Sequence, residues 1–315
     1  MTSPDAGPGK RELDEARLTG ARVIQIAYDP VPGRFDAAHL REINRRIFQD
    51  MPGAGYPDVT PGQYRPAIAS GDWMKSRKLE TYAGDSAVAY SRMDAAAQEK
   101  LDAVLKGADP QSLAILDTTS FTSAMADLYT RLDHLHPFPD GNSRTLRVFT
   151  KQLAAASGYN LDWERFNRDA ATREGLYVAR DKSVNDIALP DMYSEQAMRQ
   201  VIASMAQFRQ APNLHQLLAG AVRPLRSIAF EQLPEAEAVA QHAELKPVYA
   251  GLRTARESAV AIYPNNDTAQ QQVLAQVKGK IVTTLDSGKL PPDIQRVQQP
   301  PAAYAADTHP RDRER

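Results

Sequence analysis

The chain has 315 residues, enough for about two domains, and its 38 Lys and Arg residues against 39 Asp and Glu give a formal net charge of −1. This balance argues against nucleic acid or an acidic membrane as a partner. The lack of cysteine excludes disulfides, thiolate nucleophiles, iron–sulfur clusters and Cys-ligated zinc. With no long apolar run and a polar start, the chain is expected to be cytoplasmic, without a membrane span or a secretory signal.

The first elements differ in their apolar patterning. Residues 1–22 carry Pro, Gly and charges without an apolar period and are expected to be a disordered N-terminal segment. A short extended piece is predicted at 23–28. From Asp36, apolar residues recur at helical spacing up to Met51, and the following Pro-Gly pair ends the predicted helix.

Residues 52–92 are rich in Pro, Gly and Tyr and keep neither period for long. Two strand-like pieces, at 64–70 and 88–91, predict a small β-hairpin or flap. Helical patterning returns at 93–105 and again at 120–135, where one broad apolar stripe is expected to be buried.

Further helices are predicted at 143–157, which Gly158 closes, after Asp162, and at 194–208. A break is expected near residue 210.

A C-terminal helical region is predicted at 213–290, with its clearest helix at 267–286, and a flexible tail at 291–315. The fold class expected for the whole chain is therefore mainly α. It comprises a core domain at 23–210 that carries the small hairpin, followed by the helical C-terminal region.

The residues that indicate chemistry form one string, HPFPDGNSRTLR, at positions 136–147. Gly141 and Asn142 tolerate positive φ, so successive backbone N–H groups can turn inward as an anion-binding nest. The helix predicted to follow adds the positive end of its dipole. Arg144 and Arg147 are three residues apart and are expected on one side of its first turn. The string therefore predicts a polyphosphate site.

Two further residues of the string suggest the reaction. Asp140 supplies a hard oxygen ligand, and one carboxylate with substrate phosphate oxygens is a usual way to hold Mg²⁺. His136, as a neutral imidazole, could take a proton from an attacking hydroxyl, while Phe138 is expected to point into the core. Taken singly, these residues also fit a structural histidine, a turn and a solvated helix face. A His134–His136 metal pair lacks a third ligand set.

The string resembles the signature HPFx[D/E]GNGRxxR of the Fic family. Residues 39–50 look like the early core helix of that family, and the segment GQYR at 62–65 looks like the Gly-x-Tyr-Arg element before its substrate flap. The resemblance covers about residues 30–210. It implies a mostly helical core that moves AMP from ATP to a Ser, Thr or Tyr hydroxyl of a target protein (AMPylation).

The resemblance also implies roles for single residues. His136 is the expected general base and Asp140 the expected Mg²⁺ ligand. The residues expected to bind the nucleotide and its phosphates are Gly141, Asn142, Ser143, Arg144 and Arg147. A flap within 67–90 is expected to add a strand to the target segment.

Ser143 departs from the signature, because the family has its second Gly there. The hydroxymethyl group could crowd a phosphate, or its hydroxyl could bind the phosphate or cap the next helix. Gly141 keeps the AMP-transferring form of the loop, so AMPylation is the leading hypothesis. The alternatives are a Fic-type transferase for a different phosphate-containing group, as in the phosphorylating Doc type, and a nucleotide-binding pseudoenzyme or partner-docking module.

Regulation is a second implication of the resemblance. Many family members carry an inhibitory helix with the pattern [S/T]xxxE[G/N], and Ser227 with Glu231 has this spacing. Glu231 is thus a candidate inhibitory residue that would pair with Arg147. The alternative is a separate antitoxin-like inhibitor. A faint likeness of the C-terminal region to modules of proteins linked to conjugative plasmids suggests a toxin or an effector translocated into a target cell, and a partner-binding helical domain fits equally.

Overall fold

The computed structural model describes residues 9–290, so the predicted tail at 291–315 and the predicted disorder of residues 1–8 lie outside the described residues. The chain divides into two compact units between Arg223 and Pro224, and each is described by itself. Both are mainly helical, as predicted. Within residues 9–290, none of the helices combines the length and the apolar character needed to cross a bilayer.

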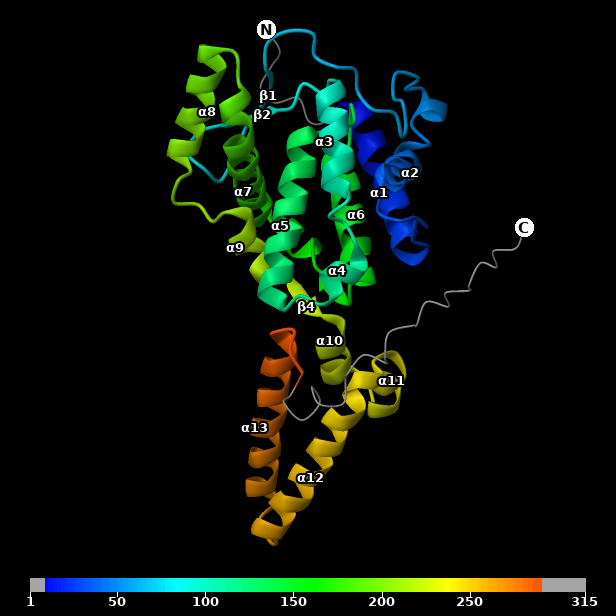
Figure 1. Cartoon of the computed structure of the whole chain (residues 1–315), viewed down its shortest axis with the longest axis vertical. Helices are drawn as coiled ribbons and strands as arrows, with labels where there is room; N and C mark the ends of the chain where they lie inside the picture. Colours follow the sequence, from blue (N-terminus) through cyan, green and yellow to red (C-terminus); the bar gives the residue numbers. More distant parts are fainter. Residues whose placement is uncertain (1–8, 291–315) are drawn as a thin grey trace, which may run out of the picture. The chain divides into compact units, whose positions relative to one another are not determined.

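The first unit is built around helices of very different length (Figure 1). They are α1 (Lys10–Tyr28), α2 (Ala37–Phe48), α3 (Ala95–Leu105), α4 (Pro110–Ala114), α5 (Thr118–Leu135), α6 (Asn142–Ala156), α7 (Ala170–Ala188), α8 (Glu195–Gln207) and α9 (Leu214–Ala219). The strands are β1 (Trp73–Arg77) and β2 (Ser86–Tyr90), which form an antiparallel hairpin, and β3 (Tyr159–Leu161) and β4 (Val222–Pro224), which form a second pair.

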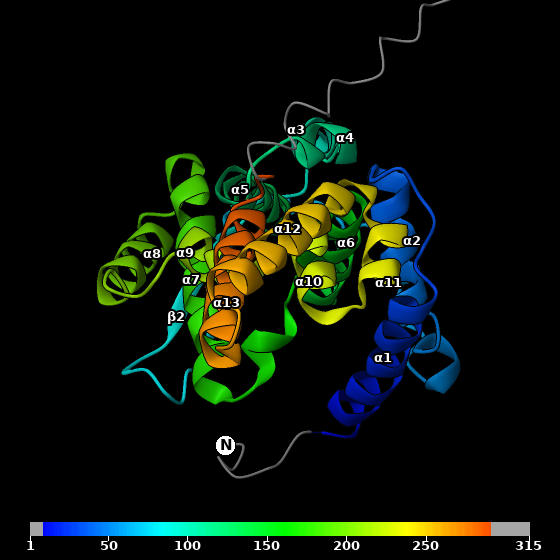
Figure 2. The ribbon, with the colours of Figure 1, turned by 90° about the horizontal axis from the view of Figure 1, so that it is seen from below.

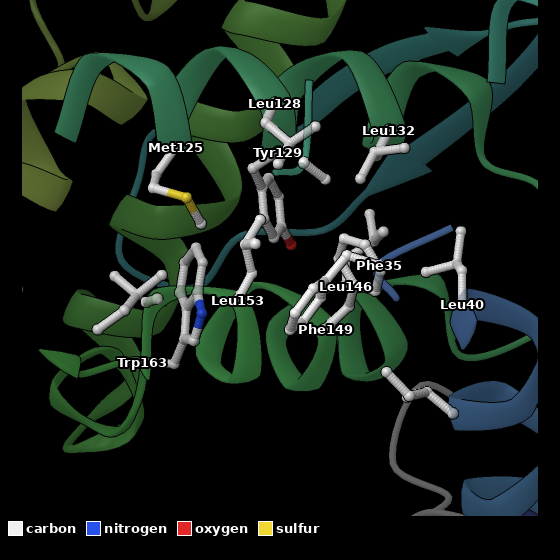
Figure 3. Close-up of a cluster of buried hydrophobic side chains, with 14 of the residues drawn as sticks. Phe35, Leu40, Met125, Leu128, Tyr129, Leu132, Leu146, Phe149, Leu153 and Trp163 are labelled. Atoms are coloured by element: carbon white, nitrogen blue, oxygen red, sulfur yellow. The ribbon is translucent and has the colours of Figure 1, made fainter. Parts of the chain in front are cut away.

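The core of the first unit lies between α5 and α6. Figure 3 shows side chains of α5 directed toward those of α6, namely Met125, Leu128, Tyr129 and Leu132 toward Leu146, Phe149 and Leu153. The apolar stripe predicted at 120–135 is confirmed, because each of its members is buried. Burial of each large apolar side chain contributes about 1.5–3 kcal/mol, so this contact holds the string that follows α5 in place.

Helix α1 contradicts the predicted disorder of residues 1–22, as far as they are described, and the extended piece predicted at 23–28. It lies beside α2 (Figures 1 and 2) and buries Ile26 in the common core. Arg22 forms an ion pair with Asp50, with 2.6 Å between Nε and Oδ2. Only Thr19 and Ile26 of this helix are buried, and its contacts with other elements help to stabilise it.

The predicted hairpin is present, although its first strand begins at Trp73 and not at residue 64. Trp73 stands opposite Tyr90 in the register. The outer edge of β2 is bound by Asn185 of α7, which accepts a bond from the backbone N of Ala89 at 3.0 Å and donates one to the carbonyl of Ala87 at 2.9 Å. An added strand would therefore have to pair with β1.

The second unit contains α10 (Leu225–Gln232), α11 (Glu235–Gln241), α12 (Lys246–Ile262) and α13 (Asp267–Asp286). Helices α12 and α13 lie side by side in both views (Figures 1 and 2). The helix predicted at 267–286 is confirmed. The first unit reaches beyond the expected break near residue 210, because α9 buries Leu214 and Leu218 in the main core.

Candidate active site

His136 ends α5 and turns the chain into the loop. Its φ of 45° is left-handed, and its carbonyl accepts a bond from Nε of Arg65 at 2.8 Å. The imidazole is 94% buried and lies against two rings of the hairpin, with its centroid 3.9 Å from that of Tyr90 and 5.1 Å from that of Trp73. The hairpin therefore covers the proposed base.

The two nitrogens of the His136 ring face opposite charges. Nε2 lies 3.2 Å from Nζ of Lys75 on β1. Nδ1 lies 3.7 Å from Oδ1 of Asp133, and no hydrogen-bond partner reaches it within the part of the chain that is described. Burial lowers the pKa of His136 to about 4. The ring is therefore neutral at pH 7, which is the state a general base requires.

Asp133 and Arg180 form a buried ion pair beneath the loop, and sequence reasoning missed both. Nε and Nη2 of Arg180, on α7, donate to the Asp133 carboxylate at 2.8–3.0 Å, and both side chains are about 1% exposed. Nη1 of Arg180 donates to Oγ of Ser143 at 3.2 Å. The hydroxyl at the unusual position of the signature is thus engaged by the protein itself. The one sequence signal for this ion pair was the position of Asp133, an acidic residue next to the buried apolar stripe of α5.

The loop after His136 is closed by its own side chains. Phe138 is fully buried, as expected. Oδ1 of Asn142 accepts a bond from the backbone N of Phe138 at 3.0 Å, and Nδ2 donates to its carbonyl at 2.7 Å. The Asn142 side chain therefore shapes the loop, and what this residue can offer a phosphate is its backbone N–H.

Gly141 leads directly into α6 with a φ of 71°, and a Cβ there would overlap the ring of Phe48. Both facts require glycine. No side chain among residues 9–290 caps the start of α6, so the N–H groups of its first turn can bind an anion. The exposed side chain of Asp140 lies next to this point. The described residues contain no cluster of three or more His, Asp or Glu for a metal, so an ion would need further ligands from a substrate.

The guanidinium groups of Arg144 and Arg147 diverge, contrary to the prediction that they share one side. Arg144 donates to Glu15 at 2.7 Å and to Thr19 at 3.1 Å, both on α1. Arg147 donates to Asn167 at 3.2 Å. Spacing along a helix sets only the direction of the Cα–Cβ bonds. The long side chains then turn toward acceptors on other elements.

The segment 62–65 supports the loop from outside. Gly62 has a φ of 73°, and its backbone N donates to Oδ1 of Asn44 at 2.8 Å. Nδ2 of Asn44 donates to Thr145 on α6 at 3.1 Å. The backbone N of Arg65 donates to the carbonyl of Pro137 at 2.8 Å. The segment thus ties α2 to the start of the loop, and Asn44 ties α2 to the first turn of α6.

Glu231 lies on α10 of the second unit, where it borders a groove with Tyr249 and Lys278. Its pairing with Arg147 stays a prediction.

The buried histidines predict a loss of stability in mild acid. Burial lowers the pKa of both His134 and His136 to about 4, whereas an unfolded imidazole keeps a pKa of about 6.5. Between these values the unfolded state binds more protons, so the free energy of unfolding should fall by several kcal/mol as the pH drops from about 6.5 to 4. Urea unfolding across this range measures the slope, and a His134→Gln variant should reduce it. A flat profile would contradict the assignment.

Comparison with known proteins identifies the segment that holds this loop. The model of the Fic/DOC family matches residues 34–154. These residues form a Fic/DOC family domain. Outside them, the Fic domain is flanked by α1 and by the helices that begin with α7.

Several curated relatives match about half of this chain. The chain is 28% identical over 167 residues to the protein adenylyltransferase VbhT of Bartonella schoenbuchensis, covering 52% of this chain and 30% of that protein. It is 25% identical over 165 residues to the probable protein adenylyltransferase Fic of Escherichia coli, covering 51% of this chain and 70% of that protein. The chain thus spans less than a third of the length of VbhT.

Among solved structures, the chain is similar to the BepC protein of Bartonella tribocorum, a VirB-translocated effector solved with bound AMPPNP. The identity is 18% and the TM-score 0.45, with 69% of this chain and 89% of that chain covered.

Proposed function

We propose that the chain transfers AMP from ATP to a Ser, Thr or Tyr hydroxyl of a target protein. The observation that carries the proposal is the position of a neutral, buried His136 in the loop that leads into the uncapped start of α6. A proton acceptor and an anion site in one loop suit transfer of a phosphorus group. Relatives named protein adenylyltransferases support AMP as the group.

The proposed step balances as a displacement at the α-phosphorus of ATP. The target oxygen forms a bond to this phosphorus, and the bond from it to the bridging oxygen breaks, so pyrophosphate leaves. The hydroxyl proton passes to His136. The first-turn N–H groups of α6, with Gly141 at its start, would bind the phosphates and offset the charge of the leaving group.

Asp140 is the residue that would hold Mg²⁺, because its exposed carboxylate stands beside the anion site. A bound Mg²⁺ would neutralise phosphate charge and orient the leaving group. Arg144 and Arg147 remain candidates for the nucleotide, although each would have to leave its present partner.

A target hydroxyl must displace Lys75 to reach Nε2 of His136, since the ammonium group lies 3.2 Å from that nitrogen. Burial lowers the pKa of Lys75, which eases its departure from the site. The target segment would add to the free edge of β1, which brings its backbone next to Lys75.

The wider assignment follows from this activity. The first unit, described from residue 9 to residue 223, would act as the transferase core, and residues 224–290 would act as a helical module for partner binding. Inhibition would come from Glu231 or from a separate antitoxin-like protein. The chain would act as a toxin or an effector, in the cytoplasm or translocated into a target cell.

The experiment that tests the function uses ATP labelled at either the α- or the γ-phosphate. The protein is incubated with a bacterial or a host-cell lysate, with and without Mg²⁺. Protein-bound label from α-labelled ATP only, and only with Mg²⁺, is the expected result. Label from γ-labelled ATP would instead show phosphorylation. No label from either source, with ATP still bound in calorimetry, would favour nucleotide binding without transfer.

Nucleotide binding without transfer is the second candidate, since both motif arginines have protein partners and Lys75 covers the base. The residue it invokes is Ser143. Because the hydroxyl of Ser143 is bonded to Arg180, we expect Ser143→Gly to change the rate of transfer by less than about threefold and to lower stability by about 1 kcal/mol. A rate increase of tenfold or more would show that Ser143 blocks transfer.

A further inference from the structure

A carboxylate behind the proposed base is the feature that the function above does not use. Asp133 lies one helical turn before His136, with Oδ1 3.7 Å from Nδ1. This nitrogen is buried, and no group among residues 9–290, Asp133 included, lies within hydrogen-bond distance of it. A buried imidazole nitrogen without a partner is costly, so its orientation toward a charged acceptor requires an explanation.

Arg180 keeps Asp133 ionised and in place. Burial alone would raise the pKa of this carboxyl, but the charge of Arg180 and the neighbouring imidazole lower it below its ordinary value. Three contacts of 2.8–3.0 Å from Arg180 fix the plane of the carboxylate. The result is a fixed negative charge on the Nδ1 side of the ring.

We propose that Asp133 is a positioning residue that holds the proton of His136 on Nδ1 and leaves the lone pair of Nε2 for the incoming hydroxyl. The catalytic meaning of this arrangement rests on the proposed function, whereas the tautomer itself does not. When Nε2 accepts the proton, the carboxylate stabilises the imidazolium that forms. Arg180 acts through Asp133 and does not touch the base.

Other groups near the His136 ring could set its tautomer instead of Asp133. The charged or titratable side chains around it are Lys75 of β1, Tyr90 of β2, Arg180 of α7, Asp133 of α5 and Arg65 of the preceding loop. Lys75 is the main competitor, because donation to Nε2 would favour the same tautomer. The test has to separate these two residues.

The first readout is the nitrogen NMR spectrum of the full chain with ¹⁵N-labelled histidine at pH 7, in which protonated and unprotonated ring nitrogens are resolved. The variant Asp133→Leu/Arg180→Met replaces the buried ion pair by apolar side chains, which is often neutral for stability. We expect His136 to carry its proton on Nδ1 in the wild type and in Lys75→Met, and to shift toward Nε2–H in the double variant. Nε2–H in the wild type, or a shift caused by Lys75→Met alone, would overturn the proposal.

Asp181→Asn is the matched control. Asp181 is an equally buried acid of α7, but it binds Arg77 at 3.1 Å and Ser86 at 2.8 Å. The variant Asp181→Asn should lower the free energy of unfolding but leave the proton of His136 on Nδ1.

The second readout is transfer. If the wild type transfers AMP, the double variant should lose about 100-fold in kcat with little change in the KM for ATP, while Asp181→Asn keeps its kcat within about threefold. An unchanged kcat in the double variant would overturn the role of Asp133. If no variant or wild type transfers AMP, the proposed function fails, while the NMR result still decides the tautomer.

Discussion

His136→Ala is expected to reduce AMP transfer by at least about 100-fold, because a positioned general base contributes roughly 10²–10⁴-fold. The imidazole is neutral, and Nε2 faces the side from which β1 would present a target. The measurement is incorporation of α-labelled ATP into a purified target at saturating ATP. ATP affinity by calorimetry should change little, since the phosphates would bind to the backbone of α6.

His134→Ala provides the matched control for this variant. His134 is also buried near the end of α5, and burial lowers its pKa to about 4 as well. It lines a separate cavity of about 430 Å³ together with Arg92 and Lys100. The variant His134→Ala should therefore lower the free energy of unfolding about as much as His136→Ala does. Its rate of AMP transfer should stay within about threefold of wild type. Transfer that survives His136→Ala, or that is lost equally in both variants, would refute the role of His136.

Gly141→Ala is expected to abolish ATP binding and to lower the free energy of unfolding by about 2–4 kcal/mol. A left-handed conformation costs a non-glycine residue about 1–2 kcal/mol, and the added methyl group would also overlap Phe48, which adds the cost of overpacking. Relief of both strains moves the backbone N–H groups at the start of α6. Calorimetry with ATP and urea unfolding measure the two effects.

Gly158→Ala separates backbone strain from overlap. Gly158 has a similar φ of 81°, but a Cβ there would meet no atom within 4 Å. It should cost only about 1–2 kcal/mol and leave ATP binding unchanged. Equal losses of stability in the two variants would show that Phe48 does not confine the loop.

The predicted flap illustrates how far a local pattern reaches. The Pro- and Gly-rich stretch at 52–92 predicts a hairpin, and β1 and β2 confirm one. Its first strand begins later than predicted because Arg65, in the segment 64–70, binds groups outside the hairpin ladder. Arg65 binds the carbonyl of His136, and its guanidinium lies 3.7 Å from the centroid of Trp73. Contacts over 70 residues away thus decide where the strand begins.

The helical core and the backbone turn at Gly141 can be predicted from the amino-acid sequence alone. Apolar periodicity predicts the buried stripe at 120–135 and the helix at 267–286. The φ preference of glycine predicts the turn at 141. Both signals act within a few residues. These are properties of neighbouring positions, so the printed string is enough to read them.

Which side chains come into contact depends on tertiary packing. Arg22 and Ile26 of α1 contact residues on other elements, and the two motif arginines diverge because Glu15 and Asn167 bind them on different sides. Asp133 and Arg180 are 47 positions apart in the chain yet share a carboxylate-guanidinium pair beneath His136. The positions of long side chains and of buried charged groups depend on which residues the packing places next to them. A local sequence pattern does not specify contacts between residues that are far apart in the chain.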